Sequence, residues 1–556
     1  MERRTLLFIV MSVVILVTYP YILRLAGVEM ATPVVTQEPA GNTPEGPLPE
    51  AARETAPPAS TPAPAAMPTE TAAVADTPAT IRNVPAPPPE RVREIPVETD
   101  LFHATLSTRG GVITLWQLKR FLDDDRTTPV SLFTPPAAGG TRYPLSITVN
   151  GSPGFENVVF QADRYTVNVS GEEQQTLRLS GTHPDTGVTL IKEITFHGDS
   201  YAMELNVLTR NLTDDYTLSL GSNFGIRTWL KNTIGFVGTS NLVDEDVTRE
   251  DPDDMASPLA RQGNIRWTVS QDKYFIAGLI PHTPVKAVIS QSFGDEHVVT
   301  ALSTEGGKPT EYTLYVGPKE YKLLKGLNVN MHENIDFGWF MFGTWSLVRL
   351  LAEPMFVMLT MINGFVPNWG LSIILLTLLI KTVFIPLTHK SYKSMKAMQV
   401  IQPQVKAIQT KYKDNKEKLG QETMALYREH NVNPLGGCLP IFIQIPFFIA
   451  FFNILYTAIE LRQEPFMGWV VDLSSKDPYY VLPVIMGISM FVQQKIQPTA
   501  MDPKQARIMM FLPVLFTFFF MQFPAGLVLY WLFNNLFTIA QQFITVRFLT
   551  KKPATT

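Results

Sequence analysis

A lysine lies in the middle of the apolar run ILLTLLIKTVFIPLTHK, residues 374–390. At the centre of a membrane helix an ionised lysine costs about 2.5–3.5 kcal/mol on insertion scales. Thr377 lies four residues before Lys381 and Thr388 seven residues after it, so a continuous helix puts all three on one face. That face must meet protein or water rather than lipid. We therefore predict a functional cation inside the membrane; the alternative is a lysine whose stem reaches the inner interface.

The last apolar run carries a matching polar stripe. Its members recur at spacings of four, four and three residues: Tyr530, Asn534, Thr538 and Gln541. An earlier run contributes Gln444. Hydrogen bonding between helices is the plainer interpretation of these amides and hydroxyls, and a hydrated groove is the functional one. No aspartate or glutamate lies in the interior of a predicted span, so Lys381 can attract an anion from outside, such as an acidic residue of a translocating protein.

The 556-residue chain has two halves of different character. Residues 31–340 hold 24 lysines and arginines against 38 aspartates and glutamates, which is typical of an acidic, soluble region. Residues 341–548 are dominated by apolar runs. The single cysteine, Cys438, excludes a disulfide within the chain. Ser-His-Asp, zinc-binding and nucleotide-binding patterns are absent, so we predict neither an enzyme nor a cofactor.

The order of segments predicts a multidomain membrane protein. Arg3 and Arg4 precede an apolar run that we interpret as a signal-anchor helix over residues 1–28. A Pro- and Ala-rich linker over 29–97 leads to a domain over 98–334. There, short alternating runs such as TLRLS, VTLIKEITF and EYTLYVG alternate with turn-rich pieces, which predicts a large all-β sandwich.

A segment over residues 335–366 is long enough to span a membrane, but Arg349 and Glu353 interrupt it one turn apart. We expect it to lie along the outer surface as an amphipathic helix, because the loop that follows is basic and belongs inside. The core over 367–550 then has five predicted spans, at 369–388, 438–460, 480–497, 507–523 and 525–548. With the anchor helix this puts both termini in the cytoplasm.

The loop over residues 389–437 carries nine lysines and arginines against four acidic residues. Apolar residues at spacings of three, four and seven predict an antiparallel helical hairpin, with a break near 413–416 and Leu419, Met424 and Tyr427 facing the first helix. Its charge suits ribosomal RNA or anionic lipid, although a solvated loop that only obeys topology rules explains it equally well. The candidate contact residues for a ribosome and its nascent chain are Lys390, Lys393, Lys396, Lys406, Lys411 and Lys413.

Several segments of the second half resemble the YidC family of membrane protein insertases. They are NWGLSIILLT (368–377), IPLTHKSYKSM (385–395), NVNPLGGCLPIFIQIPFF (431–448), DPYYVLPVIMG (477–487) and FPAGLVLYWLFNN (523–535). The resemblance is dense from about residue 335 to 548. The anchor, linker and β domain match the layout of Gram-negative members.

This resemblance implies an insertase and chaperone of the bacterial inner membrane. Its groove is open to the cytoplasm and to lipid, and it holds one positive charge, which falls on Lys381. Many bacterial members have arginine at this position. The lysine of this chain keeps the positive charge but lacks the planar guanidinium group, which can form two parallel hydrogen bonds with one carboxylate. The family's groove residues carry over to Thr377, Tyr530 and Trp531, and our own pattern adds Gln444 and Asn534.

The resemblance also implies partners. These are nascent membrane proteins, the ribosome, the bilayer, and the Sec translocon with its accessory subunits, which would contact a periplasmic β-supersandwich. Insertion would proceed alone or with Sec. Two other hypotheses stay open from the residues alone: a secondary transporter that binds an anionic solute at Lys381, and a structural subunit of a translocation complex.

Overall fold

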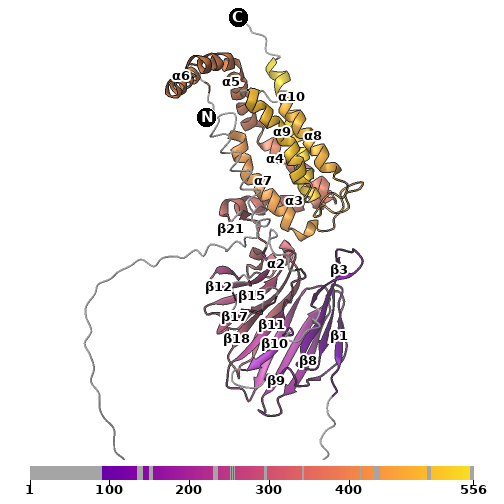
Figure 1. Ribbon diagram of the computed structural model, residues 1–556. Helices are drawn as coiled ribbons and strands as arrows, with labels where there is room; N and C mark the ends of the chain where they lie inside the picture. Colours follow the sequence, from indigo (N-terminus) through magenta and orange to yellow (C-terminus); the bar gives the residue numbers. More distant parts are fainter. Residues whose placement is uncertain are drawn as a thin grey trace, which may run out of the picture. The chain divides into compact units, whose positions relative to one another are not determined.

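The computed structural model describes residues 91–133, 142–149, 154–228, 236–250, 252, 255, 257–293, 297–340, 343–413, 415–430, 432, 439–496 and 503–550. The predicted anchor helix, the linker up to residue 90 and Cys438 lie outside these residues. Figure 1 shows that the described chain forms a β-sheet region followed by a region of helices. This order agrees with the fold predicted from the sequence.

Three sheets build the first region. The first sheet has the order β4-β3-β2-β1-β7, the largest β13-β12-β15-β16-β19-β10-β9-β8-β6, and the third β14-β17-β18-β11-β5. Most neighbours are antiparallel, and the β1–β7 pair is parallel. The strands are Glu94–Glu98 (β1), Phe102–Ser107 (β2), Val112–Leu122 (β3), Pro129–Phe133 (β4), Ile147–Val149 (β5), Gln161–Ala162 (β6), Val167–Asn168 (β7), Gln174–Thr182 (β8), Thr189–His197 (β9), Ala202–Arg210 (β10), Tyr216–Ser222 (β11), Gly238–Val243 (β12), Asp246–Glu250 (β13), Leu259–Arg261 (β14), Ile265–Gln271 (β15), Phe275–Pro281 (β16), Ala287–Ser292 (β17), Val298–Thr304 (β18) and Thr310–Pro318 (β19).

Alternating side chains make these strands amphipathic, and their apolar faces meet between the sheets. Trp116 and Trp267 are fully buried there. Trp116 stacks on Phe102 with ring centroids 4.2 Å apart, and the edge of Phe224 meets it at 5.9 Å. A large apolar core of this kind supports the domain without disulfides. Strand β1 begins at Glu94, so the predicted linker, expected to reach residue 97, ends earlier.

A lysine is among the charged side chains buried in this region. Lys192 of β9 is fully buried, and its Nζ donates hydrogen bonds to three backbone carbonyls: Gly110 at 3.0 Å, Gly111 at 2.8 Å and Leu145 at 2.7 Å. Three acceptors match the three N–H groups of an ammonium. The lysine therefore ties β9 to the segments before β3 and β5.

The second region is helical. A two-stranded ribbon, Trp339–Phe340 (β20) with Gly343–Thr344 (β21), precedes its first long helix. The helices are Tyr321–Gly326 (α2), Met331–Asn334 (η2), Ser346–Phe365 (α3), Trp369–Val383 (α4), Ile385–Lys411 (α5), Lys416–Glu429 (α6), Leu439–Thr457 (α7), Ile459–Leu461 (η3), Val481–Ile496 (α8), Pro503–Phe520 (α9) and Ala525–Thr550 (α10). Helix α3 begins eleven residues later than the predicted segment 335–366, because the ribbon occupies the start of that segment.

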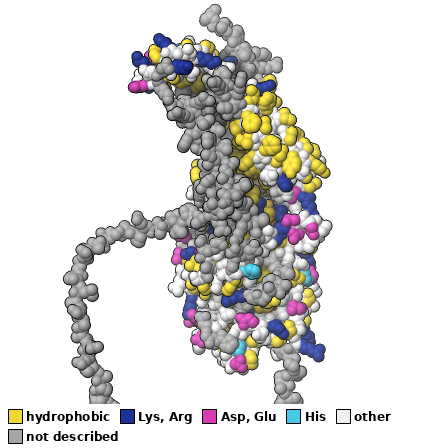
Figure 2. Space-filling view, viewed as in Figure 1, with side chains coloured by type: hydrophobic (Ala, Val, Ile, Leu, Met, Phe, Trp, Pro, Cys, Tyr) yellow, Lys and Arg dark blue, Asp and Glu magenta, His cyan; other side chains and the backbone are white. Residues whose placement is uncertain are grey.

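Figure 2 shows apolar side chains, in yellow, gathered on one side of the helical region. Exposed apolar residues of α8 and α9 include Ile488, Phe511 and Phe518, and such a surface is expected against lipid. Among the described residues, α3 and α10 are single helices long and apolar enough to cross a membrane, and the bent pair α4–α5 adds a third candidate. The apolar stretches of α7, α8 and α9 are shorter.

Candidate functional site

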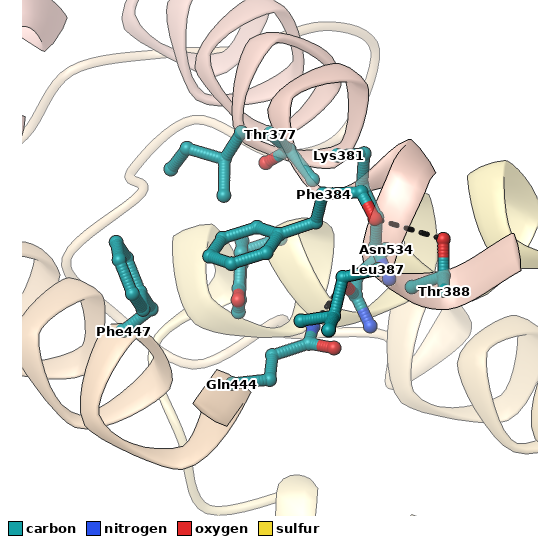
Figure 3. A pocket seen from close by; sticks show the side chains of 10 residues that line it. Thr377, Lys381, Phe384, Leu387, Thr388, Gln444, Phe447 and Asn534 are labelled. Carbon is teal, nitrogen blue, oxygen red and sulfur yellow. Dashed lines mark hydrogen bonds between the residues drawn. The ribbon is translucent and has the colours of Figure 1, made fainter. Parts of the chain in front are cut away.

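A small pocket lies between α4, the start of α5, α7 and α10 (Figure 3). It holds five of the six groove residues predicted from the sequence. Its lining is Thr377, Ile380, Lys381, Phe384, Leu387, Thr388, Gln444, Phe447, Tyr530 and Asn534. The polar members come from both predicted stripes. The two stripes therefore face each other across one space.

Helix α4 presents Lys381 to this space. The Asn368 side chain caps the helix by accepting a hydrogen bond from the backbone N–H of Leu371 at 2.9 Å. At Phe384 the chain bends by 62° into α5, so the predicted helix 369–388 does not continue straight. Pro386 in the first turn of α5 has no N–H to continue the α4 ladder, and this favours the bend. Thr388 lies beyond the bend and still lines the pocket.

The Lys381 ammonium stays inside the helical region. Its Nζ donates a hydrogen bond to the Thr538 hydroxyl of α10 at 2.9 Å. The Thr538 hydroxyl in turn donates a hydrogen bond to the backbone carbonyl of Asn534 at 2.7 Å. Within the described residues no carboxylate forms an ion pair with Lys381. A cation that is bonded to a hydroxyl and has no carboxylate partner can still attract an acidic group.

Two further hydrogen bonds join α10 to its neighbours. Gln541 donates through Nε2 to the hydroxyl of Thr388 on α5. Gln444 of α7 donates through Nε2 to Oδ1 of Asn534 at 2.7 Å. Together with the Lys381–Thr538 bond these form what we call the polar ladder, three bonds that each have one end on α10. Interhelical bonds of this kind contribute about 0.6 kcal/mol each on average.

Aromatic and aliphatic side chains occupy most of the space between these polar groups. Figure 3 shows the Phe384 ring projecting into the pocket toward Phe447. The two rings meet edge to face with centroids 5.1 Å apart. The free space left for water is about 20 Å³, which is room for about one molecule. The pocket is thus much smaller than the open groove expected from the sequence.

Trp531, the sixth predicted groove residue, lies outside this lining. Its ring packs against Phe448, Phe516 and Phe520 at centroid distances of 4.8, 6.1 and 5.1 Å. Its neighbour Tyr530 faces the pocket and stacks on Phe451 at 4.5 Å. Consecutive residues of a helix point about 100° apart, so the pair divides between the pocket and the α9 surface.

The predicted hairpin consists of α5 and α6. All six lysines predicted to meet the ribosome and nascent chain are exposed on it: Lys390, Lys393, Lys396, Lys406, Lys411 and Lys413. Figure 2 shows dark blue side chains at this end of the helical region. Met424, expected against the first helix, is exposed, and Leu426 is buried instead.

The sequence pattern missed the apolar residues of the pocket. Ile380, Phe384, Leu387 and Phe447 line it. Spacing offered a partial signal, because Phe384 follows Lys381 by three residues. An apolar residue in an apolar helix nevertheless gives no sign that it faces polar groups. Among the described residues no group of three or more His, Cys, Asp or Glu side chains is arranged to hold a metal ion.

Comparison with known proteins places both halves of the chain. Residues 94–358 match the family model described as YidC periplasmic domain, and residues 361–552 match the one described as 60Kd inner membrane protein. The Membrane protein insertase YidC of Syntrophus aciditrophicus is 39% identical over 487 residues, which cover 84% of this chain and 87% of that protein. The protein of the same description from Geobacter metallireducens is 35% identical over 559 residues, covering 98% of each.

Solved structures are similar at lower identity. The crystal structure described as an active YidC insertase with its first transmembrane domain resolved is 18% identical, covers 81% of this chain and 92% of its own, and has a TM-score of 0.36. The YidC structure from Thermotoga maritima is 13% identical, covers 81% of this chain and 96% of its own, and has a TM-score of 0.30.

Proposed function

The chain belongs to the YidC family of membrane protein insertases, and from this premise we propose how its residues carry out insertion. It is a membrane protein insertase of the inner membrane with a periplasmic domain, and not an enzyme. Its substrates are nascent membrane proteins. The proposal concerns the roles of the groove residues, the partners and the orientation in the membrane.

Lys381 is proposed to hold acidic residues of a substrate during insertion. The observation that carries this role is the Lys381 ammonium, which lies in a pocket between helices and bonds only a hydroxyl there among the described residues. An acidic group entering this space gains a favourable charge interaction in a low-dielectric setting. It also finds hydroxyl and amide groups at Thr377, Gln444 and Asn534 in place of water.

The apolar segment of the substrate then leaves for the lipid. Each buried CH₂ group contributes about 0.8 kcal/mol, so a segment of ordinary hydrophobicity moves outward without another energy source. The groove reduces the thickness of water-free hydrocarbon that the polar flanks of the substrate must cross. No covalent step is involved.

The exposed lysines of the hairpin are proposed to receive the ribosome and the emerging chain. Cations spread along α5 and the turn that follows it suit the phosphate backbone of RNA. The Sec translocon and its accessory subunits are proposed as further partners, and insertion takes place with or without them. Both termini are proposed to lie in the cytoplasm, because the basic hairpin and the lysine at the end of α8 mark the inner side.

The test reverses the charge at Lys381. In vesicles reconstituted with purified protein, Lys381→Glu is expected to lower the insertion of substrates with acidic flanks at least about tenfold, because attraction becomes repulsion. Lys381→Arg should keep most of the activity. The matched control is Lys495→Glu, which reverses an exposed charge at the end of α8. Unchanged insertion by Lys381→Glu would refute the electrostatic role.

A further inference from the structure

We propose that Phe384 and Phe447 form an aromatic gate in front of Lys381, and that movement of the hairpin about the bend at Phe384 opens it. The inference rests on the proposed function, in which a substrate must bring an acidic group to Lys381. The supporting observation is that two aromatic rings fill the pocket and that one of them belongs to the residue between α4 and α5.

The closed pocket is too small for its proposed guest. Its free volume of about 20 Å³ admits about one water molecule. A carboxylate with its side chain is larger, and an extended backbone larger still. Phe384 and Phe447 are the aromatic rings that meet inside the pocket. Moving them apart is therefore the direct way to make room near the ammonium.

Phe384 is the single residue between α4, which ends at Val383, and α5, which begins at Ile385. Its backbone angles of −86° and 0° set the 62° bend between the helices. Residues that absorb such changes at the end of an element act as hinges. A rotation here moves the ring and the hairpin together, because both are attached to the same backbone.

Phe447 provides a fixed partner for this hinge. It lies on α7, which packs along α3, whereas α4 packs along α10 and α3. The edge-to-face contact joins the bend to α7 across the pocket. Such pairs contribute about 0.5–1.5 kcal/mol beyond simple burial, which corresponds to roughly a two- to twelvefold bias toward the closed state.

The polar ladder adds a second restraint on the hinge. The Thr388 hydroxyl accepts a hydrogen bond from Gln541 of α10. The same hydroxyl donates a hydrogen bond to the backbone carbonyl of Phe384 at 3.0 Å. Swinging α5 away from α10 breaks the bond to Gln541. A partner that pulls on the hairpin thus releases both the ring contact and this bond. Access to Lys381 becomes conditional on an engaged hairpin.

The first test measures access to the pocket. Cys438 is replaced by Ser, and Thr377→Cys reports from the lining, where Thr377 is 1% exposed. In vesicles with the cytoplasmic side outward, Phe384→Ala is expected to raise the labelling rate of this cysteine by a water-soluble maleimide about three- to tenfold. The matched control is Phe511→Ala, because Phe511 is 65% exposed on α9. An unchanged rate in the Phe384→Ala protein overturns the gate.

The second test locks the gate. The Cys438→Ser protein receives both Phe384→Cys and Phe447→Cys. A short, reducible, bifunctional thiol reagent then joins the two new cysteines. Crosslinking is expected to stop insertion, and reduction to restore it to the level of the untreated double variant, whereas the reagent leaves each single cysteine variant at its own untreated level. Normal insertion by the crosslinked protein contradicts the gate. So does an inactive reduced protein, because removing a gate must leave the path open.

The two proposals can fail separately. If Lys381→Glu inserts normally while Phe384→Ala still speeds labelling, the charge hypothesis fails and the gate stands. If Lys381→Glu is inactive and labelling is unaffected by Phe384→Ala, the reverse holds.

Discussion

The Lys381 ammonium lies 2.9 Å from a hydroxyl of α10 and inside the helical region, not at its edge. Residue spacing was enough to predict this neighbourhood, because polar residues at intervals of three and four stand out in an apolar helix. The aromatic gate gave no such signal. Phe384 and Phe447 differ in no visible way from the phenylalanines that face lipid, so only the fold separates them.

Lys192 illustrates a second limit at the residue scale. In TLIKEITF it alternates with Leu190 and Ile194, which is the pattern of an inward-facing position. Charge argues against burial, however, and the three carbonyls that compensate it come from segments about 50 to 80 residues away. Local sequence carries no information on such partners.

Burial lowers the pKa of the Lys192 ammonium from 10.5 to about 7. Between pH 7 and 10.5 the unfolded chain then binds more protons than the folded one, so the free energy of unfolding rises with pH across this window. Each pH unit adds up to about 1.4 kcal/mol. Lys192→Met is expected to remove this contribution and, at pH 9, to destabilise the β domain by about 3 kcal/mol, because carbonyls lose their donors.

Pulse proteolysis of the full-length protein in a urea series, repeated at several pH values, measures this difference. Lys322→Met serves as the control, because Lys322 is exposed on α2 and bonds no buried carbonyl among the described contacts. Equal slopes against pH for the wild-type and Lys192→Met proteins would show that Lys192 does not change its proton affinity on folding.

The positions of the strands were easier to predict than the neighbours with which they pair in the sheets. The runs VTLIKEITF and EYTLYVG coincide with β9 and β19, since strict alternation is a local property. Their pairing is not local: β19 lies between β10 and β16 in the largest sheet. The bend at Phe384 was also missed, because an apolar helix can continue past one proline, and the sequence pattern does not say whether it does.

The hairpin permits a test at the scale of an element. Replacing its six exposed lysines by Gln is expected to weaken ribosome binding at least about tenfold and to make the binding less sensitive to salt, because fewer counterions are released. Co-sedimentation with ribosomes across a salt series measures both quantities. The control replaces exposed Gln399 and Gln409 by Ala, which changes no charge. Equal salt slopes for the Lys-to-Gln and wild-type proteins would exclude an electrostatic landing surface.

For the whole molecule, the distribution of charge predicts the orientation in the membrane. In a Cys438→Ser protein, the cysteine introduced by Lys411→Cys on the hairpin is expected to react with an impermeant thiol reagent only from the cytoplasm. A cysteine at Tyr479, which is 70% exposed before α8, should react only from the periplasm. Labelling of intact cells and of inverted vesicles distinguishes the two sides. Reaction of both cysteines from one side would contradict the proposed topology.

The polar ladder has a consequence for how a new copy of the protein matures. Each of its three bonds has one end on α10, at Asn534, Thr538 or Gln541. Their partners on α4, α5 and α7 precede α10 in the sequence and are therefore synthesised first. All three bonds can be present only after Gln541 has been added. The contacts of α4, α5 and α7 across the pocket are therefore complete only once the final helix has been synthesised.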